Sequence, residues 1–103
     1  MAVDTKVALL QVFLERDSYG LAAIEQVRKM TNGTVRLVQG RVYPALRELE
    51  AEGLLESYQG EPMQERGGRP RRYYRITAKG RRVAHSEARS ILKLFRVGFE
   101  VGV

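Results

Sequence analysis

The chain has 103 residues, of which 44% are hydrophobic and 29% are charged, with a formal net charge of +6. This length predicts one compact domain, and we expect a domain of this size to pair with a second copy. Cysteine is absent, which excludes disulfides and thiolate chemistry. Because we find neither a signal peptide nor an apolar run of membrane length, we expect a cytoplasmic protein without membrane contact.

The positive charge is concentrated in one part of the chain. Residues 66–86 hold eight Lys and Arg and no acid, whereas residues 1–65 hold seven Lys and Arg against ten Asp and Glu. Arginine predominates in this stretch, and its planar guanidinium suits phosphates and base edges. A solvated basic loop is the alternative, but the pattern favours a polyanion as partner.

The first predicted helix covers residues 4–16, with Asp4 as its cap. Apolar side chains nearly encircle this helix, so both of its sides need cover. One side can face its own domain, and the other predicts a partner subunit.

A second helix is predicted from about Tyr19 to Met30, capped by Ser18 or Asp17. Its expected inner face is Leu21, Ile24, Val27 and, at its end, Met30. The turn at 31–33 ends this helix, and the β-branched alternation of 34–38 predicts a very short strand. The third helix begins near residues 39–41 and ends at Gly53, a suitable left-handed C-cap. Its inner stripe is Val42, Ala45, Leu46 and Leu49. Two such helices with a short connection predict a helix-turn-helix.

Strands are predicted at 54–58 and 71–76, with a long flexible hairpin tip between them. Alternation directs Tyr74 and Ile76 inward and Arg71, Tyr73 and Arg75 outward. A final helix from 78 to about 97 would be roughly 30 Å long, so part of it should pack beyond its own subunit. We expect a mainly α protein with a small β-hairpin (α+β): a winged helix-turn-helix over residues 1–77 and a C-terminal dimerisation helix over 78–103, forming one compact unit.

The candidate DNA contacts lie in three places. The third helix should place its N-terminal residues against base edges, its acidic second half should repel phosphate, and the basic wing can follow the backbone or enter a minor groove. The residues that open the second helix could clamp a phosphate, although a plain N-cap is the alternative for Ser18. The candidates are Ser18, Tyr19, Gln39, Arg41, Tyr43, Arg47, Arg69, Arg71 and Arg72.

Catalysis finds little support in the sequence. His85 is the single histidine, and no cysteine or carboxylate cluster accompanies it. We therefore expect no enzyme, no cofactor and no metal site.

Three stretches resemble the PadR family of bacterial transcriptional regulators: DSYGLAAIEQV, GRVYPALRELEAEGLLES and GRPRRYYRITAKGRR. They match the family's Ser-Tyr-Gly opening of the second helix, its Tyr-Pro-Ala-Leu recognition helix and its wing returning through Arg-x-Tyr-Tyr. The chain departs from the usual Ser-Pro-Gly-Thr before that helix, with Val38, Gln39, Gly40 and Arg41 in its place.

The resemblance implies a homodimeric winged-helix repressor that binds double-stranded DNA at a palindromic operator and is often released by a small-molecule effector. It also implies that the first and last helices form the dimer, in agreement with their apolar faces. The expected interface residues are Leu9, Phe13, Ile91, Leu92, Phe95 and Phe99. An effector pocket near the three phenylalanines is one alternative, and plain packing is the simpler one. A protein-interaction module for an acidic partner, or a ligand sensor without DNA activity, remain as rival functions.

Overall fold

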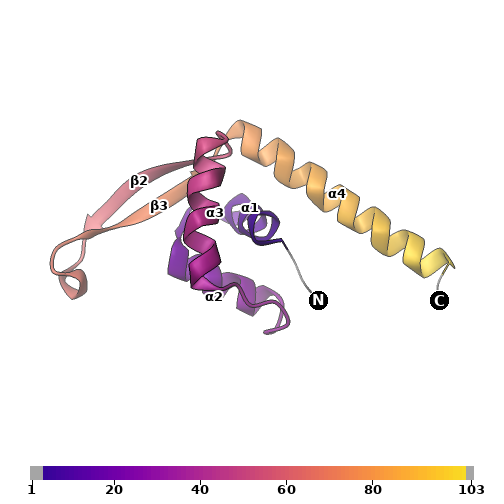
Figure 1. Cartoon of the computed structure of the whole chain (residues 1–103), viewed down its shortest axis with the longest axis horizontal. Coiled ribbons are helices and arrows are strands. Elements are labelled where there is room, and N and C mark those ends of the chain that lie inside the picture. Colours follow the sequence, from indigo (N-terminus) through magenta and orange to yellow (C-terminus); the bar gives the residue numbers. More distant parts are fainter. Residues whose placement is uncertain (1–3, 102–103) are drawn as a thin grey trace.

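The computed structural model describes the backbone of residues 4–101 and the side chains of residues 4–94. In chain order its elements are α1 (Thr5–Glu15), β1 (Ser18–Tyr19), α2 (Gly20–Met30), α3 (Gln39–Ala51), β2 (Leu55–Pro62), a 3-10 helix η1 (Gln64–Arg66), β3 (Pro70–Ile76) and α4 (Ala78–Val101). Helices α1, α2 and α3 pack together, while the β2–β3 hairpin extends to one side and α4 to the other (Figure 1). The expected fold class, a mainly α winged helix-turn-helix, is confirmed.

Helix α1 is buried by its own chain. Asp4 caps it, because the Asp4 Oδ1 accepts hydrogen bonds from the backbone N–H of Lys6 at 2.9 Å and of Val7 at 3.2 Å. Leu9 is 0% and Phe13 is 1% exposed within the single chain. The expectation that Leu9 and Phe13 form a dimer interface is therefore wrong, because α2, α3, α4 and β3 cover α1 and leave these side chains no free surface.

The segment between α1 and α2 forms a strand that was not expected from the sequence. In β1, Ser18 pairs with Tyr74 and Tyr19 pairs with Tyr73 of β3. Ser18 is only 5% exposed, and the N-cap residue of α2 is Tyr19, which makes no side-chain cap. The predicted cap by Ser18 or Asp17 is thus wrong, because Ser18 is held in the sheet and the Asp17 carboxylate accepts the Tyr58 hydroxyl at 2.7 Å.

Helix α2 buries one narrow face and exposes the residue beside it. Gly20, Ala23, Gln26 and Val27 are buried, whereas Leu21 is 47% exposed. Val27 is thus buried as predicted, whereas the predicted inward positions of Leu21 and of Met30, which is 51% exposed, are wrong.

The segment 34–38 is a loop rather than the predicted strand. The Thr31 hydroxyl accepts the backbone N–H of Val35 at 3.0 Å, which bends the chain directly after α2. Leu37 still reaches the core, but within residues 4–101 no strand pairs with this segment.

Helix α3 has the predicted boundaries and buried stripe. Val42, Ala45, Leu46 and Leu49 are each at most 6% exposed. Gly53, just beyond the C-cap Glu52, has φ of 78°, a left-handed conformation that favours glycine. The turn at Gly53 therefore ends the helix, and the face opposite the buried stripe is left to solvent.

The sheet has the strand order β1-β3-β2. Strands β2 and β3 pair from Leu55 and Ile76 to Gln59 and Arg72, and pairing resumes after a bulge at Pro62 and Pro70. Strand β2 is therefore longer than the predicted 54–58, and the flexible tip is shorter than expected. Tyr74 and Ile76 face the core, as predicted, and each is 5% exposed.

Helix α4 is fastened at its first turns. The Thr77 Oγ1 accepts the backbone N–H of Gly80 at 3.0 Å and donates to the Gly53 carbonyl at 2.7 Å, which confirms Thr77 as the cap. The Gln11 side chain donates to the Ala84 carbonyl at 2.9 Å. Beyond this docked start, α4 extends away from the other helices (Figure 1).

Candidate nucleic-acid interface

The exposed face of α3 carries the four side chains that were predicted to read DNA. Gln39, Arg41, Tyr43 and Arg47 are all exposed, opposite the buried stripe. Three of them offer amide or guanidinium donors, and the fourth offers a hydroxyl beside an aromatic ring. The N-terminal half of α3, residues 39–45, therefore presents donors and contains no acidic residue, whereas Arg47 lies next to Glu48 in the second half.

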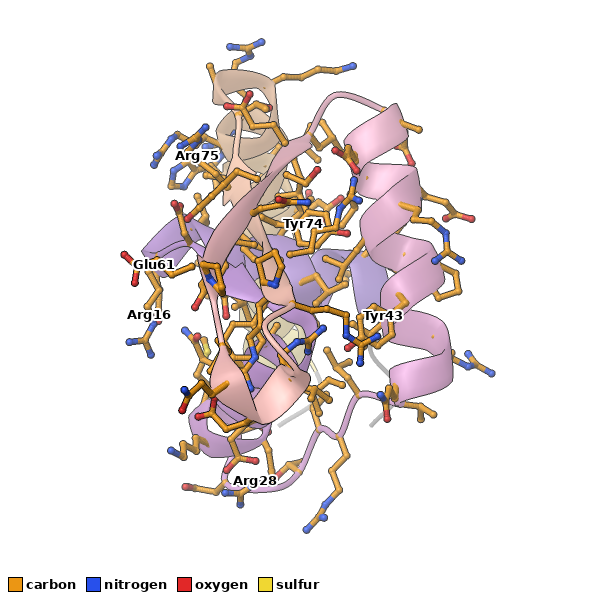
Figure 2. The ribbon with its side chains drawn as sticks, turned by 90° about the vertical axis from the view of Figure 1, so that its left-hand side faces the viewer. Arg16, Arg28, Tyr43, Glu61, Tyr74 and Arg75 are labelled. Atoms are coloured by element: carbon orange, nitrogen blue, oxygen red, sulfur yellow. The ribbon has the colours of Figure 1, made fainter. Side chains whose placement is uncertain are left out.

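Tyr43 is held in place by the start of α2. A Cβ added to Gly20 would lie 2.7 Å from the Tyr43 Cε1 and 3.0 Å from its hydroxyl oxygen, so the tyrosine ring occupies the space that a side chain at position 20 would need. The ring remains 37% exposed. Tyr43 and Tyr74 lie on the side of the hairpin that faces α3, whereas Arg16, Glu61 and Arg75 lie on the opposite side (Figure 2).

The second half of α3 is acidic, and its acids are paired with cations. The Lys6 Nζ lies 2.5 Å from a Glu52 carboxylate oxygen and 3.2 Å from one of Glu48. The Glu50 carboxylate accepts the Ser57 hydroxyl and a guanidinium N–H of Arg72 at 3.3 Å. The Ser57 hydrogen bond, followed by the charge of Arg72, holds the pKa of Glu50 below its ordinary value.

Arg72 therefore lies beside the acidic end of α3 rather than at the wing tip. Its Nη2 also donates to the Ser57 Oγ at 2.9 Å. This cluster connects both strands of the hairpin to α3.

The tip of the wing presents a different set of arginines. Gly67 and Gly68 have φ of 66° and 83°, so the chain turns sharply directly after η1. Arg69 is exposed at this turn, and its Nε donates to the Arg66 carbonyl at 3.1 Å. Arg66 and Arg69 are the basic side chains at the outer end of the hairpin.

Arg71 is folded back onto the protein. Its guanidinium carbon lies 4.4 Å from the centroid of the Tyr19 ring, and its Nη1 donates to the Met63 sulfur at 2.9 Å. The Arg71 Nε is buried and has no hydrogen-bond partner among the described residues. The outward direction predicted for Arg71 is confirmed, but the side chain rests on Tyr19.

A row of tyrosines covers the outer face of the sheet. The Tyr19 and Tyr73 rings meet edge to face at 5.3 Å, and the Tyr73 and Tyr58 rings stack at 5.6 Å. The hydrogen bond to Asp17 raises the pKa of Tyr58 above its ordinary value. Tyr73 therefore points outward, as predicted, and packs across the strands against Tyr19 and Tyr58.

Two residues that were predicted to contact DNA are less exposed than such contacts require. Ser18 is buried in β1, which leaves its hydroxyl out of reach of a phosphate, and Tyr19 is half-buried beneath Arg71. Arg36 is exposed in the loop leading into α3 and is a further candidate contact, which was not predicted because that loop was expected to be a strand. Its position directly before α3, the helix predicted to read DNA, was the available signal.

The exposed apolar residues of α4 are the remaining surface of interest. Ile91 is 40%, Leu92 is 64% and Leu94 is 73% exposed. The predicted interface residues Phe95 and Phe99 have side chains outside the described part of the structure. Among the described residues, no helix is long and apolar enough to cross a membrane, and no group of His, Cys, Asp and Glu could hold a metal ion.

Comparisons with known proteins agree with this geometry. The model of the transcriptional regulator PadR-like family matches residues 9–86. An uncharacterised protein of Lysinibacillus sphaericus is 30% identical, with 89% of this chain and 87% of that protein covered. A transcriptional regulator from Clostridium thermocellum has a TM-score of 0.79 and 26% identity, covering 94% of this chain and 88% of its own. Bacillus subtilis PadR, solved in complex with operator DNA, has a TM-score of 0.70 and shares the fold at 17% identity, covering 81% of this chain and 44% of its own.

Proposed function

Because the chain belongs to the PadR-like family of transcriptional regulators, we propose that it is a homodimeric repressor that reads a palindromic DNA operator. The observation that carries this proposal is the exposed face of α3, where Gln39 and Arg41 present donors in an N-terminal half that contains no acid, and Arg47 follows just before the acidic end. Such donors suit the acceptor-rich purine edges of the major groove. The family is one of transcription regulators and not of enzymes.

The charges of α3 determine which part of the helix approaches DNA. Glu48 and Glu52 at its far end would repel phosphate, although Lys6 offsets part of their charge. The N-terminal half of α3 therefore enters the groove, and Arg69 at the wing tip contacts the neighbouring backbone.

Dimerisation supplies the two-fold symmetry of the operator. Ile91, Leu92 and Leu94 expose apolar surface on the part of α4 that extends from the domain, and a second copy would cover it. Paired recognition helices would then be one helical turn of DNA apart, roughly 34 Å.

An effector would act through α1 and α4. A groove of about 380 Å³ lies between these helices and the end of α3, with Val7, Leu10 and Val83 at its apolar surface and Lys6, Lys79 and Glu87 among its charged residues. A small molecule bound there would contact both helices and alter the position of α4.

The test is selection of a random duplex library with the purified protein, followed by anisotropy titration of the enriched duplex at two salt concentrations. We expect a palindrome, and we expect Arg41→Ala to change the preferred base at one position of each half-site. Arg89→Ala removes the same charge from an exposed position of α4 and should leave the preference unchanged. Absence of binding at low salt would contradict the proposal and favour a protein partner instead.

A further inference from the structure

Tyr19 and Gly20 form the step from β1 to α2. This step contacts both α3 and the wing, the two elements that are proposed to bind DNA. Gly20 lies against Tyr43 of α3, and Tyr19 lies against Arg71 of the wing strand β3. We propose that this step is a positioning element that fixes the recognition helix and the wing relative to each other. The inference rests on the proposed DNA-binding function and assigns residues to it that do not themselves touch DNA.

The contact on the α3 side depends on the absence of a side chain. Gly20 has no positive φ, so its backbone conformation does not require glycine. The lack of space requires glycine instead, since a Cβ at position 20 would lie 2.7 Å, 2.9 Å and 3.0 Å from Cε1, Cζ and Oη of Tyr43. Any side chain at position 20 would therefore displace the Tyr43 ring and its hydroxyl from the exposed face of α3.

The contact on the wing side runs through Arg71 to the tip. Tyr19 pairs with Tyr73 across the strands and supports the Arg71 guanidinium at 4.4 Å. Arg71 in turn donates to the Met63 sulfur. The Met63 carbonyl accepts the backbone N–H of Arg66 and of Gly68, each at 3.0 Å, so Met63 anchors the turn that carries the tip arginines.

The two contacts are coupled because they leave from adjacent residues of one chain segment. That segment is hydrogen-bonded to β3 on one side and continues into α2 on the other. A displacement of the wing strand is therefore transmitted to Tyr43 through the peptide unit that joins Tyr19 to Gly20. In this arrangement Arg71 is a positioning residue for the tip, whereas Arg69 is exposed and free to meet a phosphate.

The first experiment tests the contact between Gly20 and Tyr43 by a double-mutant cycle on affinity for the selected duplex. We expect Gly20→Ala to weaken binding by about tenfold, which corresponds to about 1.4 kcal/mol. In a Tyr43→Ala background the same change should have no further effect, because the displaced ring is gone. Leu21→Ala alters the next residue of α2, an exposed one, and should leave affinity unchanged.

The second experiment separates positioning from phosphate contact by the salt dependence of binding. Arg71→Gln should lower affinity yet keep the slope of log K against log salt, whereas Arg69→Gln should reduce that slope by about 0.9. Tyr19→Phe keeps the ring that supports Arg71 and should retain affinity. Tyr19→Leu should lose affinity, and its effect should not add to that of Arg71→Gln.

Additive effects of Gly20→Ala and Tyr43→Ala, or a slope reduced by Arg71→Gln as much as by Arg69→Gln, would overturn the inference. If circular dichroism shows that Gly20→Ala does not fold, the comparison of Tyr19→Phe with Tyr19→Leu decides instead. A wild-type protein that binds no duplex at low salt would contradict the proposed function itself, which distinguishes the two failures.

Discussion

Replacing Gly80 by alanine should destabilise the protein, although alanine is the better helix former. Gly80 lies in the first turn of α4, and a Cβ at this position would be 2.1 Å from the Leu54 carbonyl oxygen and 2.7 Å from the Ile76 Cγ1. Because one neighbour is backbone, the clash cannot be relieved by rotating a side chain. The start of α4 would have to move by more than about 1 Å to restore a normal contact.

That movement endangers the hydrogen bonds which fasten α4 to the sheet. The Thr77 N–H donates to the Leu54 carbonyl at 3.1 Å, and the Thr77 hydroxyl donates to the Gly53 carbonyl at 2.7 Å. Each such bond contributes about 1 kcal/mol, and overpacking a buried site costs about 1–3 kcal/mol. The higher helix propensity of alanine over glycine offsets at most about 1 kcal/mol of this loss. The net loss in the free energy of unfolding should be about 1–3 kcal/mol.

Urea denaturation followed by circular dichroism measures this loss, with all variants at one protein concentration because the proposed dimer would contribute to stability. Gly40→Ala is the matched control, since Gly40 lies in α3 with no atom within 4 Å of its added Cβ. We expect that control to be neutral or stabilising by up to about 1 kcal/mol. A Gly80→Ala protein as stable as the wild type would refute the steric reasoning.

Three further predictions concern α4 and the end of α3. Burial, followed by the charge of Asp4, raises the pKa of Glu87, so the wild type should lose stability as pH rises from the ordinary glutamate pKa through the raised value. Glu87→Gln should remove this loss, and equal pH profiles of the two proteins in thermal melts would contradict it. Leu92→Asp should weaken the proposed dimer by introducing charge into the exposed apolar surface, which sedimentation at graded concentrations would show as a shift toward monomer. Gly53→Ala forces alanine into φ of 78° and should cost about 1 kcal/mol in urea denaturation, while an unchanged midpoint would indicate that the turn relaxes.

Signals close together in the chain predicted most of the helices correctly. Asp4 and Thr77 are caps with their partners a few residues away, and the stripe of α3 repeats at helical spacing. These features depend on nearest neighbours, so a single sequence carries them. The same logic predicted the direction of Tyr74 and Ile76 in β3.

The errors share a different cause. Strand β1 exists only because β3 lies beside it, and its two residues carry no pattern of their own. Arg71 points outward as alternation requires, but its partner is Tyr19, which lies far from it in the sequence. Likewise, the apolar side chains around α1 indicated that Leu9 and Phe13 are buried. The pattern could not indicate that the same chain, rather than a second subunit, buries them. Side-chain partners of this kind follow from tertiary packing rather than from local pattern.

The pairing of β1 with β3 also has a consequence for how the chain folds. The hairpin of β2 and β3 joins neighbouring segments and can form early, whereas β1 must find β3 across α2 and α3. Contacts between distant segments require loop closure first, and they tend to form late. The β1 edge should therefore be the last strand to join the sheet, so α3 and the wing should acquire their fixed relative position late in folding, when Tyr19 and Gly20 come into place.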